Sequence, residues 1–301
     1  MPDAISARRV IRPLQALAMG LSLLAMVSAS LRVSAQGTAS SDGTHAVFPD
    51  VKLWYTDTGG SGVPIILLHA GTGSSRVWEF QIPTLTAAGF RVIAFDRRGW
   101  GRTVSAVATT PAAADVIRLA DYLTIDRFHL FGTAAGGFVA FDTALSYPNR
   151  IRSLTVANSI GGIEDEEAKA IGRRIRTPEF EALTEDVKEL GPEYRAANPD
   201  GLRRWLELEK LSRPEGPRQA AQPFKSRISL AAIETLTMPV LVIAGGADLY
   251  APPTLMRQFA SHIKGVSFVV IPDAGHSAYW ENPALFNQTL VEFLRRQKER
   301  R

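Results

Sequence analysis

One segment, residues 127–147, constrains the fold of this chain more than any other. It runs from an apolar stretch, Phe128–Phe131, through a turn flanked by Gly132 and Gly136 into a helix-patterned stretch. Glycine at both flanks indicates a sharp turn in which a side chain would strike the neighbouring strand or helix. The spacing is that of a nucleophile elbow, Gly-x-nucleophile-x-Gly, but its apex is Ala134, whose methyl group cannot attack a substrate. The segment therefore predicts a strained strand-to-helix turn without a reactive side chain at its tip.

Continuous apolar runs alternate with helix-patterned stretches along most of the chain. Such runs are typical of strands buried on both faces of a parallel sheet. Besides the run in the elbow, the predicted buried strands are Pro64–His69, Arg91–Phe95, Ser153–Ala157, Pro239–Ala244 and Val266–Ile271, preceded by two short strands, His45–Phe48 and Val51–Tyr55. The helices predicted between and after them cover Val77–Ala88, a stretch that starts at Pro111, Pro252–Ile263 and Pro283–Gln297. The predicted fold class is α/β, with a mostly parallel central sheet flanked by helices.

The composition changes at Gly161. Residues 164–213 are dense in charge and in helix formers and contain no buried-strand pattern. We interpret residues 161–230 as an inserted helical cap, and residues 36–160 and 231–301 as the core that it covers. An ordinary solvated helical excursion is the alternative.

The N-terminus has the order of a secretory signal. Arginines precede an apolar run, Leu14–Val27, and small residues follow it up to Ala35. The run is shorter than the roughly 20 apolar residues that a membrane span needs. We therefore expect residues 1–35 to be a cleaved signal peptide, the mature chain to have no stable membrane span, and the protein to be periplasmic or secreted. A faint twin-arginine pattern leaves the export route open.

Charge and cysteine content exclude several classes of function. Removing residues 1–35 takes away four arginines and one aspartate, so the formal net charge falls from +4 to +1. No basic stripe with interleaved aromatics remains, so we expect no nucleic-acid partner. The chain has no cysteine, which excludes disulfides and thiolate catalysis. Its histidines and carboxylates have no metal-ligand spacing, so we expect neither a metal nor an organic cofactor. The oligomeric state is left open.

Five segments resemble, in order, the motifs of the α/β-hydrolase fold superfamily. LLHAGTGSS resembles the oxyanion loop, with Ala70 where the usual His-Gly pair has glycine, and FDRRGWGRT resembles the Asp-x-Arg-Gly-x-Gly-x-Ser/Thr segment. GTAAGG lies at the elbow, PVLVIAGGADLYAPP resembles the segment that carries the acid, and GHSAYWENP resembles the segment that carries the histidine. The resemblance covers nearly the whole mature chain.

The resemblance implies a role for each matched residue. Asp248 matches the triad acid and His276 the general base, while Ala134 occupies the nucleophile position. The backbone N–H groups of Gly71 and Ala135 would form the oxyanion hole. The implied substrate is a small, largely apolar carbonyl compound such as an ester, bound between the cap and the carboxyl ends of the strands.

Other candidates have weaker arguments. The hydroxyls of Thr133, Ser159 and Ser74 lack a position from which to replace the missing nucleophile. His69 is expected to brace the oxyanion loop and Asp96 to fix its own loop. Buried packing is the expected use of the aromatic residues near the motifs, namely Trp78, Trp100, Tyr250, Tyr279 and Trp280.

The alanine at position 134 allows several interpretations. The chain is an engineered serine-to-alanine form of a serine hydrolase, or a natural enzyme in which His276 activates water without a covalent intermediate. A cofactor-free lyase or oxygenase that uses His276 as its base is a further alternative, because this fold supports more than one chemistry. A non-catalytic ligand-binding protein would not need the paired Asp248 and His276, and nothing favours a purely structural protein. We predict an esterase-like hydrolase.

Overall fold

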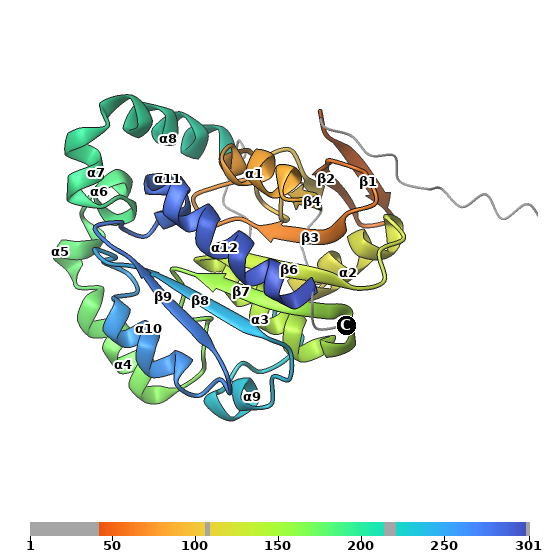
Figure 1. Ribbon diagram of the computed structural model, residues 1–301. Helices are drawn as coiled ribbons and strands as arrows, with labels where there is room; N and C mark the ends of the chain where they lie inside the picture. The colour runs from red at the N-terminus through yellow and green to blue at the C-terminus, as the bar shows by residue number, and fades with distance from the viewer. Residues whose placement is uncertain (1–41, 106–108, 214–220, 299–301) are drawn as a thin grey trace, which may run out of the picture. The chain divides into compact units, whose positions relative to one another are not determined.

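The computed structural model describes residues 42–105, 109–213 and 221–298 (Figure 1). The predicted signal peptide, residues 1–35, lies outside the described residues. Within them, nine strands form one sheet in the order β1-β2-β4-β3-β6-β7-β8-β9, and β5 pairs with β2 beside this path. The strands are β1 Thr44–Phe48, β2 Val51–Asp57, β3 Val63–Leu68, β4 Phe90–Phe95, β5 Val104–Ser105, β6 Phe128–Thr133, β7 Ile151–Ala157, β8 Val240–Gly245 and β9 Ser267–Ile271. The pairs that β2 makes are antiparallel and all the others are parallel, so the predicted α/β fold is confirmed.

Burial explains why the central strands could be recognised in the sequence. Every residue of β6 and β8 is buried, as expected of parallel strands covered on both faces. In contrast, β2 alternates between buried and more exposed residues, as an antiparallel strand near the sheet edge does. The two-residue strand β5 was not predicted, because it is too short to form a pattern.

Helices cover both faces of the sheet (Figure 1). On one face pack α2 Ala112–Tyr122, α3 Ala135–Ser146, α9 Leu230–Glu234 and α10 Pro253–Ala260. On the other pack α1 Gln81–Ala87, α11 Ala278–Glu281 and α12 Pro283–Lys298. Two short 3₁₀ helices, η1 Ser75–Trp78 and η2 Pro148–Arg150, complete the core. Side chains of the sheet thus contribute to two separate apolar layers.

The helix predicted over Val77–Ala88 is two shorter elements, η1 and α1. Pro83 explains the break, because a proline in the interior of one long helix would remove a backbone hydrogen bond and clash with the preceding turn. In the structure Pro83 lies in the first turn of α1, where its missing N–H is not needed.

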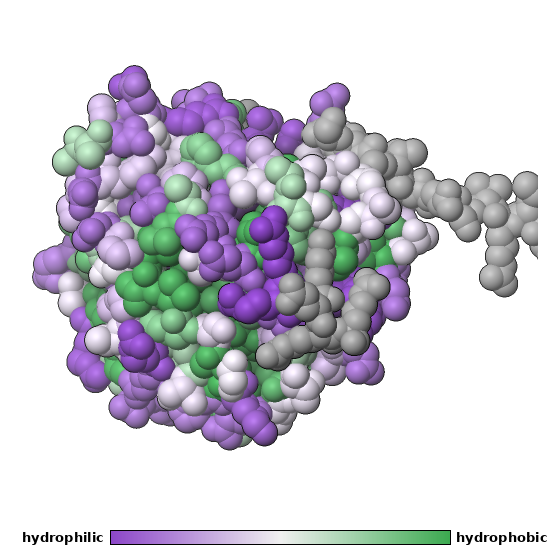
Figure 2. Space-filling model, viewed as in Figure 1, coloured by the Kyte–Doolittle hydropathy of each residue, from purple (hydrophilic) through white to green (hydrophobic). Residues whose placement is uncertain are grey.

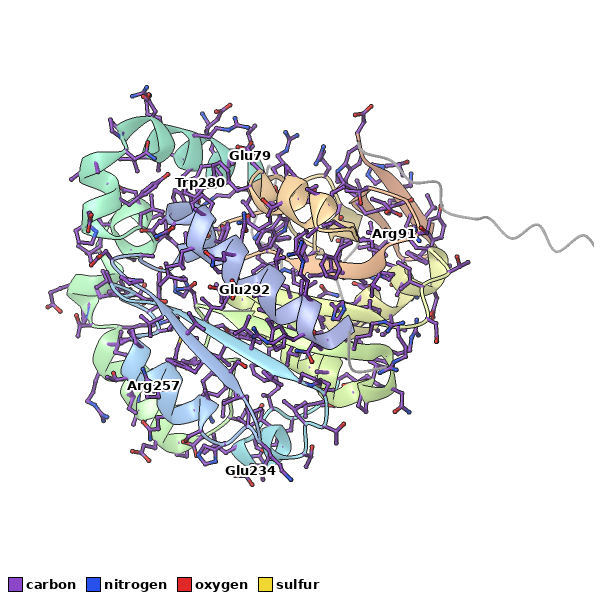
Figure 3. The ribbon with its side chains drawn as sticks, in the orientation of Figure 1. Glu79, Arg91, Glu234, Arg257, Trp280 and Glu292 are labelled. Atoms are coloured by element: carbon purple, nitrogen blue, oxygen red, sulfur yellow. The ribbon has the colours of Figure 1, made fainter. Side chains whose placement is uncertain are left out.

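The segment between β7 and β8 is helical where it is described, and none of its described residues belongs to a strand. It contains α4 Glu166–Ile175, α5 Pro178–Glu181, α6 Glu185–Glu189, α7 Pro192–Ala197 and α8 Pro199–Ser212. Trp205 and Leu208 of α8 join the same apolar cluster as α1 and α12. Arg204 of α8 also forms an ion pair with Glu79, which Figure 3 labels where α8 approaches α1. These contacts fasten α8 to the core.

The strand β9 lies at one edge of the sheet. Its first four residues are only partly buried, and Figure 2 shows apolar side chains gathered over β9 and beside α12. The guanidinium of Arg257, labelled on α10 in Figure 3, lies 4.5 Å from the centre of the Phe268 ring and covers part of this edge. No described helix is long and apolar enough to cross a membrane.

Candidate active site

The elbow has the strained turn that the sequence predicts. Ala134 connects β6 to α3 with φ 49° and ψ −119°, a positive-φ conformation that costs a non-glycine residue on the order of 1–3 kcal/mol. A Cβ at Gly132 would lie 2.3 Å from the carbonyl oxygen of Gly136, and a Cβ at Gly136 would lie 2.2 Å from that of Leu68. The N–H of Ala134 donates to the carbonyl of Ala157 on the neighbouring strand β7. The fold thus holds the bend in place although its apex carries only a methyl group.

The predicted acid and histidine meet beside this bend. The Nδ1 of His276 lies 2.9 Å from both carboxylate oxygens of Asp248, and both side chains are buried. The backbone N–H groups of Tyr250 and Ala251 donate to Oδ1 of Asp248 at 2.8 and 2.9 Å. Because β6, β7 and β8 are adjacent and parallel, the loops at their carboxyl ends lie at one edge of the sheet.

Burial and charge act in opposite directions on this pair. Burial raises the pKa of Asp248, but the charge of His276 and the hydrogen bonds to the carboxylate prevail and lower it below its usual value. Burial lowers the pKa of His276, but the charge and hydrogen bond of Asp248 prevail and raise it. The arrangement favours an imidazole with its proton on Nδ1, which leaves Nε2 free to accept a proton.

Asn158, which the sequence analysis did not identify, ties the loops of the site together. It follows β7 directly, is fully buried and has φ 48°. Its Nδ2 donates to Oδ2 of Asp248 and to the carbonyl of Gly275, both at 3.0 Å. Asn158 thereby joins the end of β7, whose Ala157 holds the elbow, to Asp248 and to the histidine loop. An asparagine directly after a buried strand was the available signal, since asparagine tolerates positive φ better than most residues.

The two predicted oxyanion-hole residues also lie close together. A Cβ built on Gly71 would lie 3.8 Å from the Cβ of Ala135. Ala135 is the first residue of α3, so its N–H has no acceptor within the helix. On the other loop, the indole N–H of Trp100 donates to the carbonyl of Gly71 at 2.7 Å. This bond orients the peptide between Gly71 and Thr72, whereas the peptide that carries the N–H of Gly71 is held through the carbonyl of Ala70, which accepts from Nη2 of Arg97.

His69 and Asp96 have the bracing contacts that the sequence predicts. The Nε2 of His69 accepts the N–H of Arg97 at 3.0 Å, so Nδ1 carries the proton and donates to the carbonyl of Ala70 at 2.7 Å. Burial, together with the charge of Arg97, lowers the pKa of His69 well below its usual value and keeps it neutral. Asp96 accepts the N–H of Arg102 in its own loop and that of Ser75 in the oxyanion loop.

Two of the three alternative hydroxyls, those of Ser159 and Ser74, form hydrogen bonds within the fold. Ser159 donates to the carbonyl of Ala134 at 2.7 Å and accepts the N–H of Gly161. Ser74 accepts from the hydroxyl of Ser212 at 2.9 Å, and Thr133 is fully buried. The hydroxyls of Ser159 and Ser74 are thus held by other groups, whereas the hydroxyl of Thr133 has no hydrogen-bond partner among the described residues but is fully buried.

The aromatic residues divide into two groups. Trp78, Tyr279 and Trp280 are fully buried in the core, as predicted. Trp100 and Tyr250 are only partly buried, so the prediction of buried packing is wrong for these two residues. The ring centre of Tyr250 lies 4.6 Å from that of His276. Ala134 and His276 are themselves only 7% and 8% exposed, so the site is enclosed. Two hollows on the described surface lie elsewhere, one between α1 and α12 and one at the turn of residues 58–62.

Two carboxyl groups beside the histidine loop, one buried and one partly buried, were also missed. Glu189, the last residue of α6, is 4% exposed, and burial raises its pKa to about 7. Burial likewise raises the pKa of Glu281 to about 7, although its carboxylate accepts the N–H groups of Gly275 and Gly191. Nothing in the local sequence distinguishes either residue from a solvated helix carboxylate.

The arrangement combines a buried histidine, a carboxylate in contact with it, and the neighbouring backbone of Gly71 and Ala135 at a bend that has no nucleophile. Such a set can remove a proton from water or from a substrate and can stabilise an oxyanion. Among the described residues, no three histidine, aspartate or glutamate side chains gather closely enough to hold a metal ion. The roles of His276, Asp248, Gly71 and Ala135 remain predictions.

Comparison with known proteins identifies related sequences and structures. The model of the alpha/beta hydrolase family matches residues 65–289. The 2-hydroxy-6-oxononadienedioate/2-hydroxy-6-oxononatrienedioate hydrolase of Burkholderia vietnamiensis is 30% identical over 271 residues, which cover 82% of this chain and 92% of that protein. A thermophilic esterase from Thermogutta terrifontis superposes with a TM-score of 0.71 at 28% identity over 85% of this chain and 97% of its own. The enol-lactonase of Burkholderia xenovorans gives 0.70 at 25% identity over 83% and 99%.

Proposed function

Because the chain belongs to the alpha/beta hydrolase family, we propose that it hydrolyses small, largely apolar ester-like substrates without a covalent intermediate. The observation that carries the proposal is the contact between Nδ1 of His276 and the carboxylate of Asp248, next to an elbow that ends in Ala134. The similar proteins named as an esterase and an enol-lactonase support the substrate class.

In the proposed reaction, His276 takes a proton from water as the water oxygen attacks the substrate carbonyl. Asp248 holds the imidazole in the required tautomer and stabilises its positive charge. The N–H groups of Gly71 and Ala135 stabilise the negative charge on the carbonyl oxygen. Water replaces the serine hydroxyl because alanine at position 134 has no atom that can form an acyl-enzyme.

The test compares three forms of the protein on a simple aryl ester. We expect His276→Ala to lose about 10²–10⁴-fold in rate, the usual contribution of a general base. Ala134→Ser should gain a burst of product and labelling by a serine-directed phosphonate, while the chain with Ala134 shows neither. An Ala134→Ser protein that folds normally but is not labelled would contradict the geometry assigned to the elbow. Unchanged hydrolysis by His276→Ala would exclude histidine base catalysis.

We also propose that the mature protein is exported. The charged, apolar and small-residue order of residues 1–35 supports this. Expression of the full chain with fractionation of the cells, followed by mass measurement of the mature N-terminus, tests it. Retention of residues 1–35 on a cytoplasmic protein would overturn it.

A further inference from the structure

The proposed reaction leaves Glu189 without a role, although its carboxyl group is buried beside the base. Its side-chain oxygen Oε2 accepts the hydroxyl of Ser277 at a long 3.4 Å. No lysine or arginine of the described residues lies within ion-pair distance of it, in contrast to Glu185 on the same helix, which pairs with Lys188. A buried carboxyl without a cation is costly to ionise, so it tends to keep its proton.

Three hydrogen bonds, one of them to the backbone of Glu189 and two to the carboxylate of Glu281, hold the segment of Glu189 against the histidine loop. The N–H of Ser277 donates to the carbonyl of Glu189 at 3.0 Å. The carboxylate of Glu281 accepts the N–H of Gly191 at 2.7 Å and that of Gly275 at 2.9 Å. Glu189 therefore lies between two anchored points and beside the residue that follows His276. This preorganisation favours a catalytic role over a chance burial.

The charges around Glu189 act from several elements. Burial has the largest effect and raises its pKa to about 7, against the opposing charge of His276. The charges of His276, Asp248 and Glu185 act on Glu189 directly. The remaining titratable and charged groups around Glu189, His276 and Tyr250 come from four elements: Tyr250 after β8, Tyr279 and Glu281 in α11, Glu181 in α5 and Arg176 after α4. A group with such a pKa holds a proton in a large fraction of molecules at neutral pH and can release it, as a general acid must.

We propose that Glu189 is the general acid that protonates the leaving oxygen of the substrate, while His276 serves as the base for water. This inference rests on the proposed function. In the step, the bond between the water oxygen and the carbonyl carbon forms, and the bond from that carbon to the leaving oxygen breaks. One water proton goes to Nε2 of His276, and the proton of Glu189 goes to the leaving oxygen. His276 then releases its proton to solvent and Glu189 takes one up, so the site is restored.

The experiment compares two esters with the same acyl group, an ethyl ester and a p-nitrophenyl ester. An alkoxide needs a proton to leave, whereas p-nitrophenolate is a stable anion and does not. We expect Glu189→Gln to lose about 10²-fold or more on the ethyl ester and less than about 3-fold on the p-nitrophenyl ester. Glu189→Asp, which retains an acid, should keep more of the ethyl-ester activity. Glu193→Gln, a change at an exposed carboxylate of α7, is the matched control and should leave both rates unchanged.

Each contrary result has a separate meaning. Equal losses on both esters, or no loss on either, would overturn the role of Glu189 and leave the proposed hydrolysis standing. A natural chain that hydrolyses neither ester would overturn the proposed function and the donor role with it. Titration of the Glu189 carboxyl by NMR needs no turnover: burial should hold its pKa well above the 4.5 of a solvated glutamate. A pKa near 4.5 would leave Glu189 ionised at neutral pH and would also overturn the inference.

Discussion

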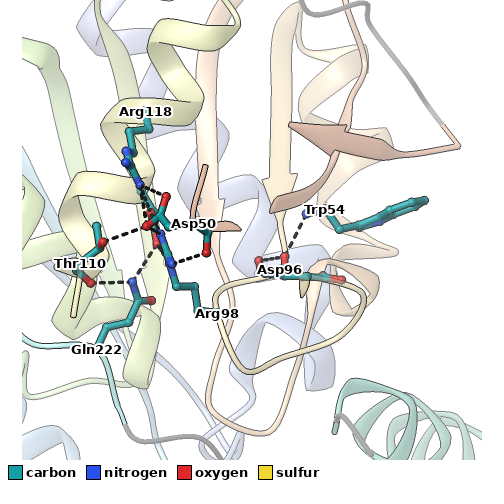
Figure 4. A network of polar contacts seen from close by, with 9 residues as sticks. Asp50, Trp54, Asp96, Arg98, Thr110, Arg118 and Gln222 are labelled. Atoms are coloured by element: carbon teal, nitrogen blue, oxygen red, sulfur yellow. Dashed lines mark hydrogen bonds and ion pairs between the residues drawn. The ribbon is translucent and has the colours of Figure 1, made fainter. Parts of the chain in front are cut away.

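Two clusters of buried charge differ in how their charges are paired. In the first, Arg98 donates to both carboxylate oxygens of Asp115 at 2.7 and 2.8 Å, and both side chains are 2% exposed. Asp50 pairs with both Arg98 and Arg118 and extends this network (Figure 4). Gln222 also donates to Asp115 at 2.8 Å. Every carboxylate in this cluster faces a guanidinium.

The second cluster surrounds His276 and contains more carboxyl groups than cations. Asp248 pairs with the imidazole, but Glu189 and Glu281 have no ion-pair partner among the described residues. In the first cluster, the paired charges of Arg98 and Asp115 hold the loop after β4 against α2. In the second, the carboxyl groups of Glu189 and Glu281 have no cation to keep them ionised, so they can bind and release protons near neutral pH. Placing a carboxyl group away from water without a cation costs stability, and proteins break such rules mainly at functional sites.

The largest effect is expected from breaking the paired cluster. Asp115→Ala leaves the buried guanidinium of Arg98 without its main partner, which costs about 3–5 kcal/mol of unfolding free energy. Asp121→Ala removes a carboxylate that pairs with Arg150 at 2.8 Å but is 61% exposed, so about 1 kcal/mol or less is expected. Urea unfolding of both variants measures the difference. Equal losses would show that burial does not distinguish the two pairs.

The next largest effect is on the pH dependence of the unfolding free energy, which should differ between the two clusters. The pKa of Glu189 rises from 4.5 in the unfolded chain to about 7, so the folded protein holds a proton that the unfolded chain releases between these values. Stability therefore falls as pH rises through this window, by at most about 1.4 kcal/mol per pH unit for this group. Glu281 acts in the same direction. Glu189→Gln should reduce the slope, and Glu193→Gln should leave it unchanged.

The paired cluster should respond at the opposite end of the pH range. Burial raises the pKa of Asp50, but hydrogen bonds from Arg98 and Thr110 and the nearby guanidinium charges lower it to about 2. Its contribution is present above pH 3.8 and is lost as pH falls towards 2. Unfolding free energy measured from pH 2 to 8 checks both directions. A stability that rises between pH 5 and 7 would contradict the assignment of buried protonated carboxyls.

The fold was predictable because its strongest signals are local. The runs that became β3, β6 and β8 are continuous and apolar, and the glycines around Ala134 fit only a tight turn. The pairing of Asp248 with His276 could be expected once the motifs were placed on a parallel sheet, because the carboxyl ends of neighbouring strands meet at one edge.

The rest of the site could not be predicted because it depends on packing. Glu189 ends a five-residue helix whose sequence, EDVKE, reads as a solvated face. Its burial arises only when α6 meets the loop of Ser277, a contact 88 residues apart in the chain. The roles of Glu281 and Asn158 likewise depend on backbone groups brought to them by distant segments.

The smallest loss of unfolding free energy is expected from Asn158, an uncharged residue in the cluster around His276. Its side-chain oxygen is buried without a hydrogen-bond partner in the described residues, so only its amide nitrogen contributes, to Asp248 and Gly275. Asn158→Gly removes both bonds while keeping φ 48° accessible, and we expect it to cost about 1–2 kcal/mol. Asn158→Ala removes the same bonds and adds the strain of positive φ, on the order of 1 kcal/mol more.

Activity separates positioning by Asn158 from bulk stability. If Asn158 orients the acid and the histidine loop, both variants should lower kcat about 10-fold with little change in KM, because the side chain of Asn158 is fully buried. The kcat loss should be the same for glycine and alanine, since it follows the lost bonds, whereas the unfolding free energies should differ by the strain. A kcat that follows stability instead would place Asn158 with Arg98 and Asp115, as a residue that fastens the fold without setting the geometry of the base.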